Sequence, residues 1–330
     1  MRTFFAVITA VVLVTLSCSS ANSQSSAESE GTISDHRVEI IRFDKDLLEY
    51  ITSPSDAKAL ALETEYKNLL PYFSRVAVGN NKIDLNQLQK YFSHPQLYKL
   101  YSETITKFSD LSDVEDELTT ASIRAKDILD KKLPAFYVHV SGLKQNVIVA
   151  DSLISLSLDK YLGRDYGLYA AFFEPYQLTT MSPEYISRDY LKAWILSEFV
   201  PENKPKDLLQ TMINEGKILY LLDALLPEKK PEILLGYTSN QMQWSTQNER
   251  QIWHAIIEKK HLYSTDPYLA ARYITDAPYT TTLSPESAPR AGQFIGWRMV
   301  DQYMKNTKKT PRELLQETAE EILRISKYNP

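Results

Sequence analysis

The residues best placed to do chemistry lie on two consecutive predicted helices between Pro183 and Pro227. The first helix carries Arg188, Asp189 and Lys192, and the second carries Glu215. Glu215 interrupts an otherwise apolar stripe that repeats at the steps of one helical face: Leu208, Met212, Leu219, Leu222 and Leu226. A charge that cannot reach water must be paired or must be lost. We therefore expect the four charged residues to meet, either as a salt-bridged core or as a site.

The spacing of these residues matches the zinc-peptidase pattern His-Glu-x-x-His, in which a following helix often supplies a third ligand. Arg188 and Lys192 stand at the two imidazole positions, Asp189 follows the first of them, and Glu215 lies where the third ligand would come from. Guanidinium and ammonium groups have no lone pair to give, so zinc cannot bind as it does in the active pattern. The two cations can instead take the metal's place electrostatically and donate to Glu215. The alternative is a coincidental surface pair on unrelated helices.

The rest of the chain predicts no metal and no other cofactor. His254 and His261 are seven residues apart, which is about 10 Å along one helix and too far for a shared ion. His139 lies on a predicted strand, where an imidazole in the core is more common than a ligand. The chain contains no Gly-x-Ser-x-Gly motif and no glycine-rich phosphate loop.

Many tyrosines lie outside clear helical stripes. They could form a surface that binds a partner or a glycan, or they could simply line a large core. These residues are Tyr161, Tyr166, Tyr169, Tyr176, Tyr237, Tyr263, Tyr268 and Tyr279.

The start of the chain predicts export and lipidation. A positive residue and an apolar run, Phe4–Leu16, precede the only cysteine, Cys18, as in a secretory signal. The residues before Cys18 resemble a bacterial lipobox, although Thr15 stands where leucine is usual. The alternative is an ordinary signal peptide that ends nearby. Acyl chains on Cys18, palmitate among them, would give a stable membrane anchor.

These features divide the chain into three parts. Residues 1–17 are the predicted lipoprotein signal, 18–34 a lipidated cysteine with a disordered tether, and 35–330 one globular domain. No aspartate of the kind that retains lipoproteins at the inner membrane follows Cys18. We therefore expect an outer-membrane anchor, with the domain facing the periplasm.

Charge argues against a nucleic-acid partner. The chain has 37 Lys and Arg against 42 Asp and Glu, a net charge of −5, and no basic stretch. A single cysteine also excludes an intramolecular disulfide.

Hydrophobic periodicity predicts a mostly helical α+β fold with a helical N-terminal half and a small mixed or antiparallel sheet. Between residues 265 and 289 we expect an ordered loop without helices. The predicted strands are 38–43, 135–140, 147–150 and 153–158. Besides the two organising helices, the predicted helices are 44–51, 54–72, 84–92, 95–108, 112–132, 246–260, 292–306 and 311–328.

Several sequence runs together resemble the gliding motility lipoprotein GldB family, in an order and spacing that fit from about residue 38 to residue 328. Each run is weak alone, but their combination is specific. They are 212–227 (MINEGKILYLLDALLP), Leu235-Gly236-Tyr237-Thr238, Gln243-Trp244, Asn248-Glu249-x-x-Ile252-Trp253, Leu262-Tyr263-Ser264, Ala277-Pro278-Tyr279 and Pro289-Arg290-x-Gly292-x-x-x-Gly296-Trp297.

The resemblance implies attachment to the cell envelope and a role in surface gliding and its linked secretion machinery, through other components of that machinery. The family is similar to predicted zinc-dependent proteases, which implies a zincin-like core whose metal motif has decayed. Arg188, Asp189, Lys192 and Glu215 would then be relic metal-site positions in a pseudoenzyme. Two alternatives stay open: an envelope hydrolase that uses Glu215 or an unrecognised acid or base, and a glycan- or peptide-binding lipoprotein.

Overall fold

A computed structural model describes residues 36–80, 82–199 and 204–330. The predicted signal segment, Cys18, and the tether to residue 34 lie outside the described residues, as does most of the turn predicted at 201–205. The chain divides after His36, and every element below belongs to the unit Arg37–Pro330. In this described part, no helix combines the length and the apolar character that crossing a bilayer requires.

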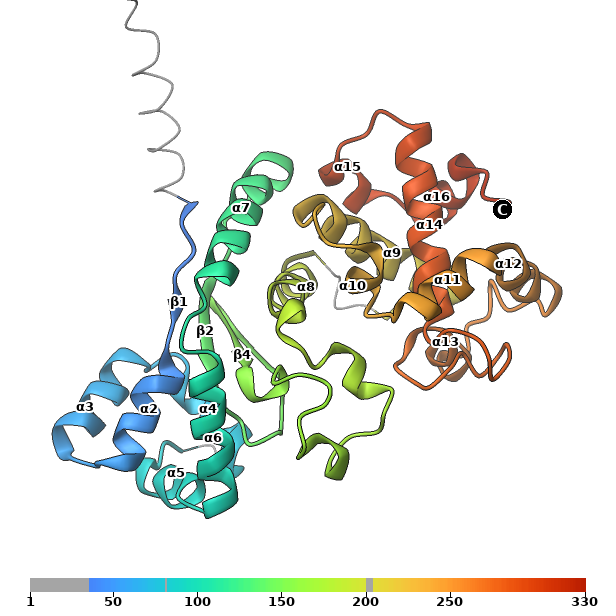
Figure 1. Ribbon diagram of the computed structural model, residues 1–330. Coiled ribbons are helices and arrows are strands. Elements are labelled where there is room, and N and C mark those ends of the chain that lie inside the picture. Colours follow the sequence, from blue (N-terminus) through green and yellow to red (C-terminus); the bar gives the residue numbers. More distant parts are fainter. Residues whose placement is uncertain (1–35, 81, 200–203) are drawn as a thin grey trace, which may run out of the picture. The chain divides into compact units, whose positions relative to one another are not determined.

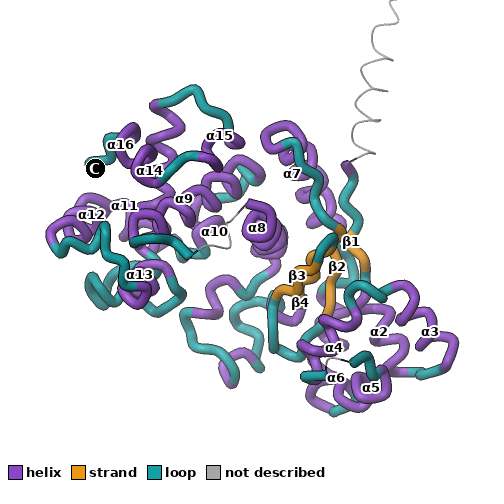
Figure 2. The backbone as a smooth tube through the Cα atoms, turned by 180° about the vertical axis from the view of Figure 1, so that it is seen from behind, coloured by secondary structure: helices purple, strands orange, loops and turns teal. Residues whose placement is uncertain are grey.

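A small mixed sheet lies among the helices (Figure 2). Its strands are β1 (Ile40–Ile41), β2 (Ala135–His139), β3 (Val147–Ala150) and β4 (Leu153–Ser157), in the order β1-β2-β4-β3. Strand β2 runs parallel to both β1 and β4, with Phe136 opposite Ile154, and β3 is antiparallel to β4. The mostly helical α+β fold with a small mixed sheet is thus confirmed.

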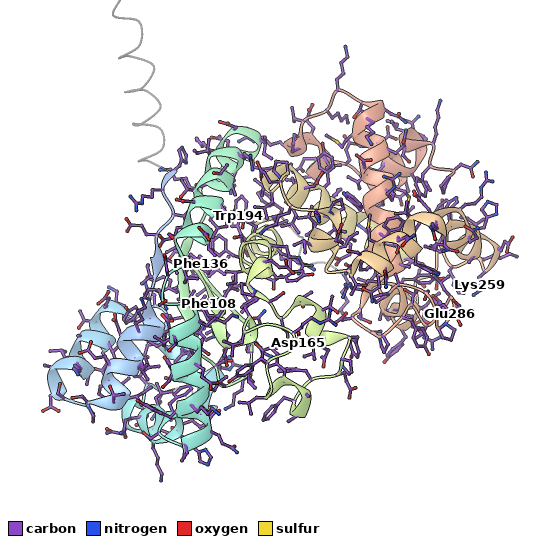
Figure 3. The ribbon with its side chains drawn as sticks, viewed as in Figure 1. Phe108, Phe136, Asp165, Trp194, Lys259 and Glu286 are labelled. Carbon is purple, nitrogen blue, oxygen red and sulfur yellow. The ribbon has the colours of Figure 1, made fainter. Side chains whose placement is uncertain are left out.

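The sheet separates two hydrophobic cores because successive side chains of a strand point to opposite faces. Phe136 and Ile154 belong to the larger core, whereas their neighbours Tyr137 and Leu153 lie at the smaller one. Phe108, Phe136 and Trp194, labelled in Figure 3, all lie in the larger core.

The N-terminal helices pack mainly around the smaller core, with Phe43 and Phe73 in edge-to-face contact at its centre. Helix α7 instead contributes Leu118, Ala121 and Ala125 to the larger core. The helices of this half are α2 (Phe43–Thr52), α3 (Asp56–Glu65), α4 (Leu70–Val78), α5 (Leu85–Phe92), α6 (Pro95–Lys107) and α7 (Ser112–Leu129).

The C-terminal half is helical and builds the rest of the larger core (Figure 1). Four short 3-10 helices precede it: η1 (Leu158–Lys160), η2 (Tyr169–Ala171), η3 (Gln177–Thr180) and η4 (Pro183–Tyr185). The α-helices are α8 (Ile186–Phe199), α9 (Leu208–Leu225), α10 (Pro231–Leu235), α11 (Ser239–Gln247), α12 (Glu249–Glu258), α13 (Pro267–Ile274), α14 (Ala291–Asn306), α15 (Pro311–Gln316) and α16 (Ala319–Ser326).

Helices α9 and α14 cross with their backbones in direct contact. Gly216 of α9 meets Gly296 of α14, and a Cβ atom added to either glycine would collide with the opposing backbone carbonyl. Both glycines belong to runs that resemble the GldB family. Their role is therefore to let two buried helices approach more closely than any side chain allows.

The structure corrects five predicted elements. The strand predicted at 38–43 is limited to β1, because α2 already begins at Phe43. The helix predicted at 54–72 is two helices, since Pro71 starts a new first turn, where its missing N–H costs nothing. The helix predicted at 246–260 breaks at Asn248, whose side-chain amide donates to the Trp244 carbonyl at 2.8 Å. The helix predicted at 311–328 is two helices, α15 and α16, because Thr318 caps a new helix after α15 ends at Gln316.

The fifth correction concerns the segment 265–289, which we predict as a loop. It contains α13, and the Asp266 carboxylate caps this helix by accepting a hydrogen bond from the Tyr268 amide at 2.9 Å. Pro267 occupies its first turn. Asp266-Pro267 is a helix-start signal in the sequence, but the many prolines of the segment led us to predict a loop.

Candidate functional site

Helix α8 positions three of the four predicted site residues. Its first half is buried almost all round, because it packs against α7, α9 and β4. Arg188 is buried, whereas Asp189 and Lys192 are half-buried. Glu215, on the neighbouring α9, is also half-buried, although the rest of its predicted stripe is fully buried.

Arg188 and Asp189 form a nearly enclosed ion pair. Arg188 Nη1 lies 2.5 Å from Asp189 Oδ1, and the two side chains are 9% and 14% exposed. The Arg188 Nε also donates to the Leu234 carbonyl at 3.1 Å. Asp189 Oδ2 accepts a hydrogen bond from the Tyr161 hydroxyl at 2.8 Å, which itself accepts one from Asn146 Nδ2 at 2.9 Å. Asp189 is therefore held in place by an arginine and a buried tyrosine.

Lys192 and Glu215 lie near each other without bonding. Within the described residues, neither side chain forms a hydrogen bond or an ion pair within 4.0 Å. Burial, together with the charges of Arg188 and Arg290, lowers the pKa of Lys192 to about 8, although the charges of Glu215 and Asp189 oppose the shift. The direct donation from the cations to Glu215 that we predict from the sequence is not formed.

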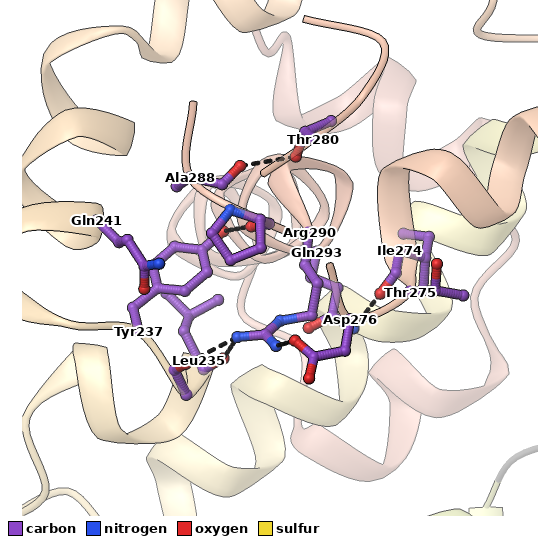
Figure 4. A network of polar contacts seen from close by, with 12 residues as sticks. Leu235, Tyr237, Gln241, Ile274, Thr275, Asp276, Thr280, Ala288, Arg290 and Gln293 are labelled. Atoms are coloured by element: carbon purple, nitrogen blue, oxygen red, sulfur yellow. Dashed lines mark hydrogen bonds and ion pairs between the residues drawn. The ribbon is translucent and has the colours of Figure 1, made fainter. Parts of the chain in front are cut away.

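Arg290, just before α14, is a member of this charged centre that sequence reasoning missed (Figure 4). Its guanidinium pairs with Asp276 and donates to the carbonyls of Leu235 and Gly236 at 3.0 and 2.8 Å. It also lies over the ring of Tyr237, 5.5 Å from the centroid. Its Nε is buried and has no hydrogen-bond partner among the described residues.

The two arginines meet at the C-terminal end of α10. A Cβ atom added to Gly236 would lie 3.3 Å from Arg290 Nη2 and 3.4 Å from Arg188 Nη2. Both guanidinium groups donate to the last carbonyls of this short helix, which are otherwise without partners and carry the negative end of its dipole. The sequence contained a signal for Arg290, because it stands in one of the family-like runs, and Gly236 stands in another.

The surrounding segments are fixed by further hydrogen bonds to the backbone. The Tyr237 hydroxyl donates to the Pro289 carbonyl at 2.6 Å. The Thr280 hydroxyl donates to the Ala288 carbonyl at 2.7 Å and accepts from the Ala291 amide at 3.0 Å. Figure 4 shows the contact between Thr280 and Ala288 near Arg290. The loop before α14 is thus fastened to the end of α10, which places Arg290 beside Arg188.

A buried Ser–His pair occurs elsewhere, in the sheet. His139 Nδ1 lies 2.7 Å from Ser155 Oγ, a distance that suits a nucleophile and its base. Both residues are fully buried, so a substrate has no access to them. Burial lowers the pKa of His139 to about 3. The imidazole is therefore neutral and acts as part of the core, as its position on a strand indicates.

The described residues do not offer a conventional metal site. In the ranges 36–80, 82–199 and 204–330, no three His, Cys, Asp or Glu side chains lie close enough to hold a metal ion. The chemistry that the charged centre supports is instead a polar joint between α8, α10 and α14. Its cations could also attract an anion.

The loop tyrosines divide between the interior and the surface. Tyr161, Tyr169 and Tyr237 are buried, which agrees with the interpretation that they line the core. Tyr263 and Tyr268 are 61% and 80% exposed. The other three are partly buried: Tyr166, Tyr176 and Tyr279.

Fold and site together define a class of protein: a helical α+β domain that holds a charged, cation-rich centre between buried helices. Comparison with protein families then gives a match over residues 24–330 to the family described as gliding motility protein GldB. The chain belongs to this family, as the sequence runs predict, and its role is in gliding motility. The family name also designates lipoproteins. No curated protein and no solved structure matches the chain.

Proposed function

We propose that this chain is a lipid-anchored protein of the outer membrane, facing the periplasm, that serves gliding motility and its linked secretion machinery by binding other components rather than by catalysis. The domain would be a pseudo-zincin, with Arg188, Asp189, Lys192 and Glu215 as relic metal-site positions. Cys18 would carry the acyl chains, palmitate among them.

The observation that carries this proposal is the state of the would-be catalytic centre. The side chain that follows the first histidine position, Asp189, is already held by Arg188 and Tyr161. At the second histidine position, Lys192 presents an ammonium group, which has no lone pair when charged. A centre built in this way supports rigid packing and recognition better than bond cleavage.

Complementation of gliding tests the proposal. Cells that lack the chain should regain gliding with wild type and with Glu215→Gln, because a binding role does not need that carboxylate. The matched variant Cys18→Ser should lose palmitate labelling and should restore gliding poorly. If Glu215→Gln abolishes gliding while the protein stays folded and abundant, or if the purified full chain holds stoichiometric zinc and hydrolyses peptides, the proposal is wrong.

One observation favours the second candidate, an envelope hydrolase. The charge of Glu215 acts on Lys192 although the two are not bonded, and a lysine with a pKa of about 8 can act as a base near neutral pH. This reading predicts a hydrolytic activity that Lys192→Met and Glu215→Gln both remove. Equal activity of the wild type and both variants would exclude it.

A further inference from the structure

A pocket on the C-terminal half combines an apolar floor with a buried cation. It measures ≈ 400 Å³ and lies between α8, α9, α15 and the start of α16. Its floor includes Ile195, Ile218 and Leu221, which are buried. This volume falls in the range of pockets that bind small ligands or side chains. None of the four predicted site residues lines the pocket.

Lys217 supplies the buried cation at one wall. The residue is only 9% exposed, and its ammonium group donates to the carbonyls of Glu317 and Leu315 at 2.7 and 3.3 Å. An ammonium group has three donors, so one is left for a ligand. Burial lowers the pKa of Lys217 to about 8, and only the charge of Glu317 opposes the shift. A buried ammonium with so little compensation favours an anionic group beside it.

The rim adds further positive charge. Lys204 and Lys206 line the opening, and both are exposed. Two carboxylates are also present, but Glu317 pairs with Lys309, and Glu320 lies 4.0 Å from Lys206. The acids at the rim are therefore largely neutralised, and Lys204 and Lys217 remain to attract an anion.

The first turn of α16 forms part of the pocket wall. Thr318 caps this helix by accepting a hydrogen bond from the Glu321 amide, and Thr318 and Ala319 both line the pocket. The first amides of a helix have no partner inside it and carry the positive end of the dipole. The first turn also carries the carboxylates of Glu320 and Glu321, and the Glu321 amide is bonded to Thr318, so the amides of Ala319 and Glu320 are the ones left to reinforce the attraction of the lysines for a carboxylate.

We propose that this pocket binds the free C-terminal carboxylate of a partner protein together with the apolar side chain of its last residue. The carboxylate would accept from Lys217 and the first amides of α16, and the apolar side chain would lie on Ile218 and Leu221. Backbone carboxylate capture of this kind is a known mode of peptide recognition. The proposal rests on the proposed function, because it specifies how the chain binds a component of the motility machinery.

The test uses the full chain in lipid nanodiscs and three defined probes. These are N-acetyl-alanyl-leucine with a free carboxylate, its C-terminal amide, and decanoate. Binding is measured by calorimetry and by protection of Lys217 from acetylation, read by mass spectrometry. The free acid should bind saturably and protect Lys217, and the amide should bind at least tenfold more weakly.

Two variants locate the binding. Lys217→Gln should weaken binding of the free acid at least tenfold, whereas Lys308→Gln, an exposed lysine outside the pocket, should not. Asn214→Asp places a negative charge in the pocket without removing the hydrogen bonds of Lys217. It should also weaken the binding of the free acid. This second variant keeps the test decisive if Lys217→Gln unfolds.

Each other outcome overturns the proposal. Equal binding of acid and amide, no saturable binding of the acid, or unchanged binding in Asn214→Asp would show that the pocket does not recognise a carboxylate. Binding of decanoate alone, abolished by Asn214→Asp, would assign the pocket to a lipid. If the pocket does not bind the free acid but gliding still depends on the chain, the proposed function stands without this pocket. Acid binding in a chain that gliding does not need removes the proposed function instead.

Discussion

Glu215 and Gly216 are neighbours on α9, yet they lie in opposite kinds of environment. Gly216 meets the backbone of α14 at Gly296 with no space for a single added atom. Glu215 is half-buried near Lys192 and forms no bond within the described residues. One side of α9 is therefore fixed by close packing against α14. The other side carries a charged group without a direct partner among the described residues. The fold depends on the first environment and the candidate site on the second.

The largest expected effect comes from filling the glycine contact. Gly296→Ala should lower the free energy of unfolding by about 4 kcal/mol or more, because the new Cβ would collide with the backbone of Met212. Gly216→Ala should act similarly. Urea unfolding followed by circular dichroism measures both. The control is Gly167→Ala, where an added Cβ meets nothing within 4 Å, and its effect should be small. Equal losses at all three glycines would refute the close-packing argument.

The next effect comes from the enclosed ion pair. Arg188→Met should cost about 3 kcal/mol, because Asp189 loses its cation and the Leu234 carbonyl loses a donor. Arg324→Met removes an exposed pair with Glu321 and should cost under about 1 kcal/mol. The same unfolding measurement compares them. A cost at Arg188 as small as that at Arg324 would mean that the charged centre contributes nothing to stability.

Lys192 should give the protein a distinctive pH dependence. Its folded pKa of about 8 lies below the ordinary lysine pKa of 10.5, so between these values the unfolded chain binds more protons. Its contribution to the free energy of unfolding therefore rises with pH in that window and is unfavourable and constant below it. The slope is at most about 1.4 kcal/mol per pH unit.

The measurement compares wild type with Lys192→Met by urea unfolding between pH 7 and roughly pH 9.5, below the range in which unfolded tyrosines ionise. The difference between the two should grow in favour of the wild type as pH increases through 8. A constant difference would show that Lys192 keeps an ordinary pKa. The neighbouring charges that set this pKa are those of Arg188, Glu215, Asp189 and Arg290.

The smallest effect is expected at Glu215. From the sequence, a buried pair with a cation would make Glu215→Ala cost about 3–5 kcal/mol, and an exposed pair under about 1 kcal/mol. The half-buried, unbonded side chain leads us to expect the lower figure. The substitution should also lower the pKa of Lys192 further, since the charge of Glu215 opposes its shift. A loss above about 3 kcal/mol would place Glu215 in the packed core after all.

The candidate site was partly predictable. Helices α8 and α9, which carry Arg188, Asp189, Lys192 and Glu215, pack together as the sequence predicts. What the sequence cannot supply is the partner of each charge. Arg188 binds the residue next to it, and Arg290 arrives from a segment a hundred residues away. Helical periodicity states which face a residue occupies, but it carries no information about a distant loop.

The sequence by itself determined the class of fold, the two organising helices and the family. These depend on local periodicity, on capping residues and on short sequence motifs, all of which can be recognised in a single sequence. Only the tertiary structure decided that the sheet divides two cores, that two glycines bring α9 against α14, and that Arg188 and Arg290 meet at the end of α10. The physical reason is that these contacts join residues far apart in the sequence. Their energy comes from burial and shape, which exist only once the chain has folded.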